Sequence, residues 1–187
     1  MKALRLLSAA LIAVLPCTLP ARAQNGPASL LLVAADGQSS SLSAAQLLAL
    51  PQTTVRVQVP HGNRAAIYQG VALPLLLARM HAPLGDKLRG PALAMYVMAE
   101  GADHYRALYA LAELEPSFHP GTVIVADRRD GKPLDAGSGP FMVVNAADRR
   151  PARWVRNLAS LRLVQVPAPP AGQPLEAHLY APRPSAP

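Results

Sequence analysis

Three short apolar runs separated by turns dominate residues 122–166 and constrain the fold more than any other part of the chain. They lie at residues 122–126, 141–144 and 161–166. Their lengths, and the Gly, Pro and Asp residues that bound them, are typical of buried strands. An arginine-rich connection that contains Trp154, the one tryptophan of the chain, precedes the third run. We therefore expect the three runs to build one buried sheet, with the basic connection held over it.

The rest of the chain predicts an α+β fold, mostly mixed β-sheet with a few short helices. Further strands are expected at residues 30–34, 53–59, 65–68, 93–99 and 105–110. Odd- and even-numbered residues are both apolar in residues 93–99, which predicts a central strand covered on both faces. Ser43 and Gln46 have the spacing of a capping box at the start of one helix. Pro74 is placed as the first residue of a second helix, which is apolar nearly all round and is therefore expected to be buried.

Turn residues divide the strands. Asp130-Gly131 is a tight-turn dipeptide between two strands, and residues 135–140 make that hairpin irregular. A turn is expected at residues 102–105, and a single helical turn at residues 111–114.

Residues 1–23 have the pattern of a secretory signal peptide. Lys2 and Arg5 precede a short apolar run, and Ala-Arg-Ala at residues 21–23 fits a cleavage site. The apolar run is too short to span a bilayer and ends at Pro16, which argues against a membrane anchor. No arginine pair precedes it, so the twin-arginine route is not indicated. We expect Sec-type export, cleavage after Ala23, no membrane span in the mature chain, and a periplasmic or secreted protein.

Composition excludes several kinds of protein. Loss of Lys2, Arg5 and Arg22 with the leader would lower the formal net charge from +7 to +4, and basic residues are scattered apart from residues 128–129 and 149–156. A nucleic-acid partner is therefore not expected. The one cysteine, Cys17, lies in the leader, so the mature chain is expected to form no disulfide and to offer no thiolate to a metal. Core packing alone must then stabilise it.

The mature chain divides into a domain and a tail. Residues 24–166 are long enough for one domain with a sizeable core. Residues 167–187 contain seven prolines and little apolar content, which predicts a flexible, extended tail. A partner-binding segment is the alternative interpretation of this tail.

Four motifs follow one another in a fixed order between residues 53 and 166. They are Tyr-Gln-Gly-Val-x-Leu-x-x-Leu-Leu at residues 68–77, Ala-Asp-His-Tyr at 102–105, Asp-Gly-Lys-Pro-Leu at 130–134 with Gly-Pro at 139–140, and Arg-Trp-Val-x-x-Leu at 153–158. In this order they resemble the oxidoreductase molybdopterin-binding domain family, which has the sulfite oxidase fold. The resemblance implies a sulfite-oxidase-like domain within residues 24–166.

The chain departs from that family at one decisive position. In the active family, a strand just before the first motif carries a cysteine whose thiolate binds molybdenum. Alignment puts Val59 at that position, give or take one residue, so the resemblance implies a short exported member that lacks the molybdenum-ligating cysteine. An isopropyl group cannot replace a soft thiolate. Val59 also continues the apolar face of Val55 and Val57, and His61 is either the nearest substitute ligand or a solvated turn residue.

The resemblance also implies a candidate cofactor pocket. Its residues are His61, Asn63, Arg64, Asp103, His104, Tyr105, Arg150 and Arg153. Arg150 and Arg153 occupy positions at which family members contact the pterin and its phosphate, and guanidinium groups suit phosphate or carboxylate. The alternative is a basic loop whose arginines pair with Asp148, Asp127 or Asp130, with Trp154 as a core anchor. Asp103, His104 and Tyr105 suit acid–base work, unless Asp103 only organises its turn and Tyr105 only packs.

Taken together, these features predict an exported binding or accessory module without bound molybdenum and without catalytic residues. Enzymes with a pterin-bound metal generally fold around it before export, whereas a Sec-type signal delivers an unfolded chain. We expect no cofactor, and a partner that is either a periplasmic protein or a small anionic ligand. Two alternatives stay open: a molybdopterin-dependent oxidoreductase that retains its cofactor non-covalently, and a binder of small anionic ligands.

Overall fold

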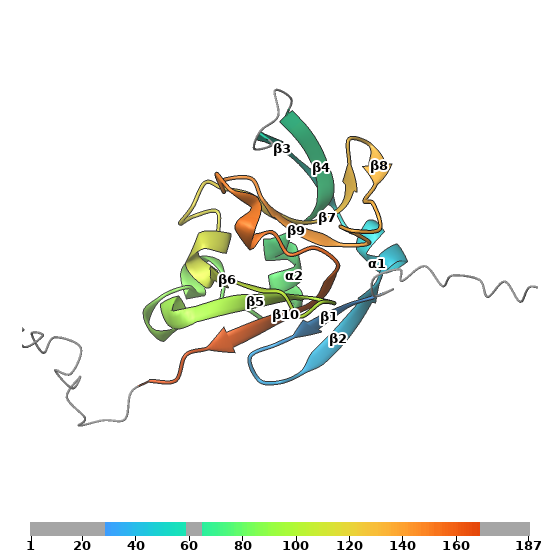
Figure 1. The fold of residues 1–187 in the computed structure, drawn as a ribbon. Coiled ribbons are helices and arrows are strands. Elements are labelled where there is room, and N and C mark those ends of the chain that lie inside the picture. The colour runs from blue at the N-terminus through green and yellow to red at the C-terminus, as the bar shows by residue number, and fades with distance from the viewer. Residues whose placement is uncertain (1–28, 59–64, 169–187) are drawn as a thin grey trace, which may run out of the picture.

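Residues 29–58 and 65–168 are described by the computed structural model and form two five-stranded sheets with short helices between and beside them (Figure 1). Sheet A has the order β2 (Ser39–Ser43), β1 (Ser29–Val33), β10 (Leu158–Gln165), β5 (Met95–Gly101) and β6 (Arg106–Ala110). Sheet B has the order β3 (Gln52–Gln58), β4 (Ala65–Ala72), β7 (Val123–Arg129) and β8 (Lys132–Pro133), and β9 (Met142–Asn145) also pairs with β7. β1 and β10 run parallel, and the other pairs are antiparallel.

The helices are short. Among the described residues, the α-helices are α1 (Ala44–Leu48) and α2 (Leu73–Arg79), and the 3-10 helices are η1 (Gly85–Lys87), η2 (Gly90–Ala94), η3 (Leu111–Leu114) and η4 (Pro151–Arg153). The predicted α+β class, with mixed sheet and few helices, is confirmed. In the described ranges no helix is long and apolar enough to cross a membrane. The predicted leader and residues 169–187 of the predicted tail lie outside these ranges and stay predictions.

Residues 122–166 do not build one sheet. β7 and β9 pair in sheet B, whereas β10 lies in sheet A between β1 and β5. The prediction of a single sheet was therefore wrong. Alternating burial in β10, with Leu161 and Leu163 buried and Arg162 exposed, identifies a strand but does not identify its partners.

The main core lies between the inner faces of the two sheets. Sheet A contributes Leu30, Val97 and Tyr109, and sheet B contributes Val125, all of them fully buried. α2 is packed into the same cluster through Leu73, Leu76 and Leu77. Burial of each such side chain contributes about 1.5–3 kcal/mol, so this cluster is the main source of stability.

A second apolar cluster covers the opposite face of sheet B. It contains Val55, Val57, Ala66, Tyr68, Ile124, Ala126, Met142 and Val144, and Trp154 and Leu134 pack against it. β7 therefore has both faces buried. β5 was expected to have this property, but Tyr96 and Met98 of β5 are only partly buried, because no described element packs over the outer face of sheet A.

Local signals placed the helices well. Ser43 Oγ accepts a hydrogen bond from Gln46 N, and Gln46 Oε1 accepts one from Ser43 N, so the predicted capping box is confirmed. α2 begins one residue before Pro74. Its expected all-round burial was wrong at Leu75, which is 41% exposed, because the helical period turns this residue outward.

The β7–β8 hairpin is tight and is tied to β4. Asp130 and Gly131 both have left-handed backbone, with φ of 51° and 77°, as a tight turn requires. Asp130 Oδ1 accepts a hydrogen bond from Ile67 N at 2.9 Å, and Asp130 N donates one to Ile67 O at 2.7 Å. After β8 the chain loops out before it returns as β9, which is the irregularity that the sequence predicts.

β4 and β7 approach each other closely at a β-bulge. Pairing passes from Gln69–Arg128 to Gly70–Ala126, which leaves Asp127 without a register partner. A Cβ atom added to Gly70 would lie 2.0 Å from Val125 O and 2.5 Å from Ala126 Cα. Backbone atoms cannot move aside as the end of a flexible side chain can, so only glycine fits here.

Gly70→Ala is therefore expected to lower the free energy of unfolding by about 2–4 kcal/mol through overpacking. Gly137→Ala is the matched control, because the added Cβ would meet only Asp135 Oδ1, at 3.4 Å. Urea denaturation of both variants measures the difference. Equal stability of the two variants would contradict this account of the β4–β7 contact.

Candidate functional site

Arg153, in the connection between β9 and β10, is held by two carboxylates and one aromatic ring. Its Nη1 lies 2.7 Å from Glu113 Oε1, and its Nη2 lies 2.6 Å from Asp148 Oδ1. Its guanidinium carbon lies 4.9 Å from the centre of the Tyr109 ring. The hydrogen bonds that Arg153 donates, first to Asp148 and then to Glu113, hold its pKa above the ordinary value, although burial lowers it. The guanidinium group therefore joins η3, β6 and the loop after β9.

The backbone and the tryptophan of this connection are held as well. The Tyr105 hydroxyl donates to Ala152 O, and the Tyr109 hydroxyl donates to Arg153 O. Trp154 Nε1 donates to Asn145 O at 3.2 Å, and the Trp154 ring meets the Tyr68 ring edge-on at 5.6 Å. Trp154 thus anchors the connection to the second cluster, which is the role that the core-anchor interpretation predicts.

The turn at residues 102–105 is organised by its own side chains. Asp103 Oδ1 accepts a hydrogen bond from Tyr105 N at 3.0 Å, and His104 has a left-handed φ of 65°. His104 Nδ1 lies 3.0 Å from Glu100 Oε1, and Arg106 Nε lies 3.0 Å from Glu100 Oε2. These two contacts hold the pKa of Glu100 below its ordinary value. The alternative role, in which Asp103 organises the turn, accounts for this geometry.

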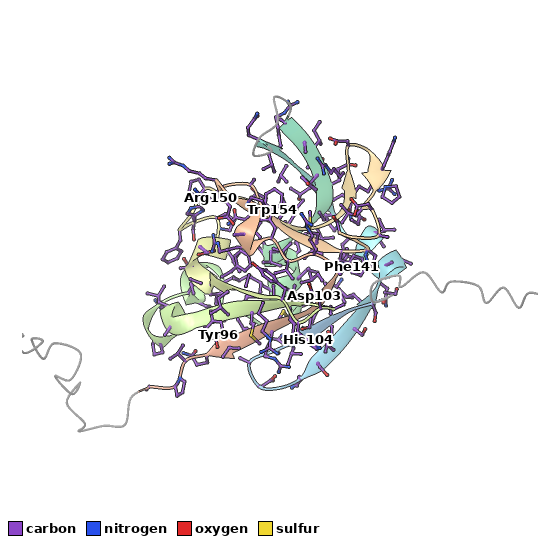
Figure 2. The ribbon with its side chains drawn as sticks, in the orientation of Figure 1. Tyr96, Asp103, His104, Phe141, Arg150 and Trp154 are labelled. Carbon is purple, nitrogen blue, oxygen red and sulfur yellow. The ribbon has the colours of Figure 1, made fainter. Side chains whose placement is uncertain are left out.

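The described part of the predicted cofactor pocket is spread over the surface. Figure 2 shows Arg150 well apart from Asp103 and His104. Tyr105 and the Arg153 segment do meet, but through a hydrogen bond that holds the η4 backbone. His61, Asn63, Arg64 and Val59 lie outside the described residues, and their roles stay predictions.

Two of the described residues of the predicted pocket are engaged in contacts within the chain. A pterin phosphate needs free donors. The Arg153 guanidinium is bound by Glu113 and Asp148, and the Tyr105 hydroxyl is bound by Ala152 O, which leaves Arg150 as the predicted arginine with no partner in residues 29–58 and 65–168. In the same ranges no three His, Cys, Asp or Glu side chains gather to hold a metal ion. Because the expected cysteine position lies outside them, the absence of molybdenum stays a prediction.

A cavity of about 380 Å³ lies elsewhere, beside Tyr68; we call it the Tyr68 cavity. It is lined by Tyr68, Arg129, Asp130, Lys132, Pro133, Leu134, Asp135, Ser138 and Met142. β4, the β7–β8 hairpin, the loop before β9 and the first residue of β9 supply these residues, and none of them belongs to the predicted pocket. Sequence reasoning missed the site because its residues come from separate segments. The one available signal was Asp130-Gly131, which brings Arg129 and Lys132 together.

A smaller cavity, of about 210 Å³, lies beside Asp127. Apolar groups of α1 and of the loop before β9 line it, including Leu48 and Phe141. The Asp127 side chain is only 8% exposed, and neither carboxylate oxygen has a hydrogen-bond partner among the described residues. Arg128 Nε, at 3.9 Å, makes a long ion pair with it. Burial raises the pKa of Asp127, and Arg128 offsets this only in part.

Comparison with known proteins supports the fold and goes no further. No family model matches the chain, and no curated protein matches it. In fold it is similar to the sulfane dehydrogenase SoxCD from Paracoccus pantotrophus, with a TM-score of 0.55 and 18% sequence identity. The match covers 78% of this chain and 40% of that chain, so the chain spans less than half the length of the protein it matches. The likeness shows a shared architecture.

The Arg153 contacts predict a difference between two neighbouring arginines. Arg153→Met should lower the free energy of unfolding by about 1–2 kcal/mol, because Glu113 and Asp148 lose a charged donor that is 40% exposed. Arg150→Met is the matched control, since the Arg150 side chain is exposed and has no partner among the described residues. Urea midpoints of the two variants give the comparison. A larger loss of stability in Arg150→Met than in Arg153→Met would contradict the structural role of Arg153.

Asp127 predicts a pH-dependent difference in stability. Because its pKa is raised in the folded state, the unfolded chain releases this proton first, and stability falls as pH rises from about 4 through the folded pKa. Asp127→Asn should remove this loss. The variant should therefore be more stable than the parent at pH 7, and the gap should close towards pH 4. Urea midpoints at several pH values measure it, with the exposed Asp86→Asn as control; a destabilised Asp127→Asn at pH 7 would contradict the prediction.

Proposed function

We propose that this chain is an exported binding or accessory module, built on a sulfite-oxidase-like domain at residues 24–166 and lacking molybdenum. The order of the four motifs supports the family, and the likeness in fold to a sulfane dehydrogenase is in keeping with an oxidoreductase ancestry. Residues 1–23 would direct Sec-type export to the periplasm or beyond, and residues 167–187 would form a flexible tail.

The observation that carries this proposal is the state of Arg153. The resemblance assigns this arginine to pterin contact, yet its guanidinium group is bonded to Glu113 and Asp148 and stacked on Tyr109. A pterin phosphate would compete with two carboxylates for this guanidinium group, whose hydrogen bonds to them are 2.7 and 2.6 Å long. The loop that would recognise a cofactor is instead used to join the two sheets.

The sequence around Val59 supports the same conclusion. Val55 and Val57 are buried in the second cluster, and Val59 follows them at the same parity. A valine at the expected cysteine position removes the soft ligand that molybdenum requires. The part of the family site that would carry redox chemistry is thus absent from the sequence.

Metal and pterin analysis tests the proposal. The mature protein, purified from its native host, is expected to contain far less than one molybdenum atom per chain by mass spectrometry. It is also expected to release no fluorescent pterin on oxidation. Stoichiometric molybdenum that is lost in a His61→Ala variant would overturn the proposal and would establish the oxidoreductase alternative.

A second candidate, a binder of small anionic ligands, is favoured by the Tyr68 cavity. Arg129 and Lys132 flank this cavity, and its volume is suited to a small molecule. Such a binder would still be a module without catalysis, so the two candidates are compatible.

A further inference from the structure

We propose that the Tyr68 cavity is a binding site for a small organic anion, a carboxylate or phosphate group carried on a compact apolar body. This inference rests on the proposed binding function, for which it names the ligand class. It places recognition at the β7–β8 hairpin and away from the Arg150–Arg153 loop.

Two donors that line the cavity have no partner among the described residues. Lys132 has no ion pair there, and the Ser138 hydroxyl has no hydrogen-bond partner there. Each of the two lining carboxylates has one oxygen bonded to the backbone, because Asp130 Oδ1 accepts from Ile67 N and Asp135 Oδ1 accepts from Gly137 N. The ammonium group of Lys132 and the Ser138 hydroxyl are therefore open to an anionic group of a ligand.

Positive charge converges on the same place. Arg129 lies over the Tyr68 ring, with 5.7 Å from its guanidinium carbon to the ring centre. Its Nε is 3.6 Å from Asp130 Oδ2, a long ion pair that leaves the rest of the planar group free to bond. Arg156 also acts electrostatically on Tyr68, and Asp130 and Asp135 act on it with the opposite sign. Counting Lys132, three positive side chains at the cavity face two carboxylates.

The Tyr68 hydroxyl is the most specific feature of the cavity. The residue is only 5% exposed, because its ring is packed against Trp154 and under Arg129. Its hydroxyl has no hydrogen-bond partner among residues 29–58 and 65–168, and it is not one of the oxygens there that are sealed from solvent. Burial raises the pKa of Tyr68, so the group remains a donor at neutral pH. A ligand oxygen would satisfy a donor that the fold leaves open.

The remaining walls are apolar. Met142 and Leu134 belong to the second cluster, and Pro133 adjoins them. The volume of about 380 Å³ lies at the lower end of the range for small-molecule sites. The ligand should therefore carry a short hydrocarbon or aromatic body beside its anionic group.

Calorimetric titration of the mature chain tests the site with four probes. 3-Phenylpropionate and phenyl phosphate are the two anionic probes, 3-phenylpropan-1-ol is the neutral control, and phenylalanine adds an ammonium group to the carboxylate. We expect binding of at least one anion, and no measurable binding of the alcohol. The stronger of the two anions identifies the head group. Equal binding of the alcohol, or stronger binding of phenylalanine than of 3-phenylpropionate, would overturn the assignment.

Two substitutions place the binding in the cavity. Tyr68→Phe keeps the ring packing and removes only the hydroxyl, and Lys132→Met removes one charge at the surface. Each substitution should lower the affinity for the anion by about tenfold, which is the effect of losing one charge-assisted hydrogen bond. Tyr96→Phe and Lys87→Met, remote from the cavity, are the matched controls and should leave affinity unchanged.

The anion site and the proposed function are contradicted by different results. Unchanged affinity in both Tyr68→Phe and Lys132→Met, or no binding of either anion at millimolar concentration, would remove the site. The metal and pterin result would stand in either case. Conversely, the protein could contain pterin and still bind 3-phenylpropionate, with weaker binding in Lys132→Met. That result would support the anion site and contradict the accessory role.

Discussion

The burial of β7 on both faces is the constraint on which the rest of the structure depends. Val123 and Val125 belong to the main core, whereas Ile124 and Ala126 belong to the second cluster. A strand covered in this way cannot slip, because a shift of one residue would exchange its two faces. Its neighbour β4 must then come so close that only glycine fits at position 70, opposite Ala126 and against Val125 O. Both sheets, and the loops that cross between them, are arranged around this strand.

The connection from β9 to β10 shows how a loop with the residues of a binding site can be structural. It must cross from sheet B to sheet A, and an unsupported crossing would leave polar backbone near two cores. Tyr105, in the turn before β6, and Tyr109 of β6 donate hydrogen bonds to its carbonyl groups, and Trp154 reaches back to sheet B. Arg153 completes the crossing with charge-assisted bonds. The contacts of Arg153 and Trp154 thus give this part of the loop a structural role.

Sequence reasoning was most successful where the cause is local. The Ser43 capping box, the Asp130-Gly131 turn and the alternation of β3 each depend on residues only a few positions apart. It failed for the partners of β10, because alternating burial fits any neighbouring strand. The Tyr68 cavity was missed for a similar reason, since no spacing along the chain links Tyr68 to Ser138. Arg153 was assigned to pterin contact because its position matches the family motif. A motif match does not reveal the two carboxylates that bind its guanidinium group in the structure.

The bulge at Asp127 has a consequence for the adjacent arginine pair. Pairing resumes at Gln69–Arg128 and Tyr68–Arg129, so Arg129 lies opposite the cavity tyrosine. Without the extra residue, the alternation of Ile124 and Ala126 would continue to Arg128, and that arginine would lie on the Tyr68 side. The two arginines now line different cavities, Arg129 the larger and Arg128 the smaller. The extra residue at the bulge therefore reverses the side of the sheet that each following side chain faces. Deleting a residue there would place Arg128 at the Tyr68 cavity in place of Arg129.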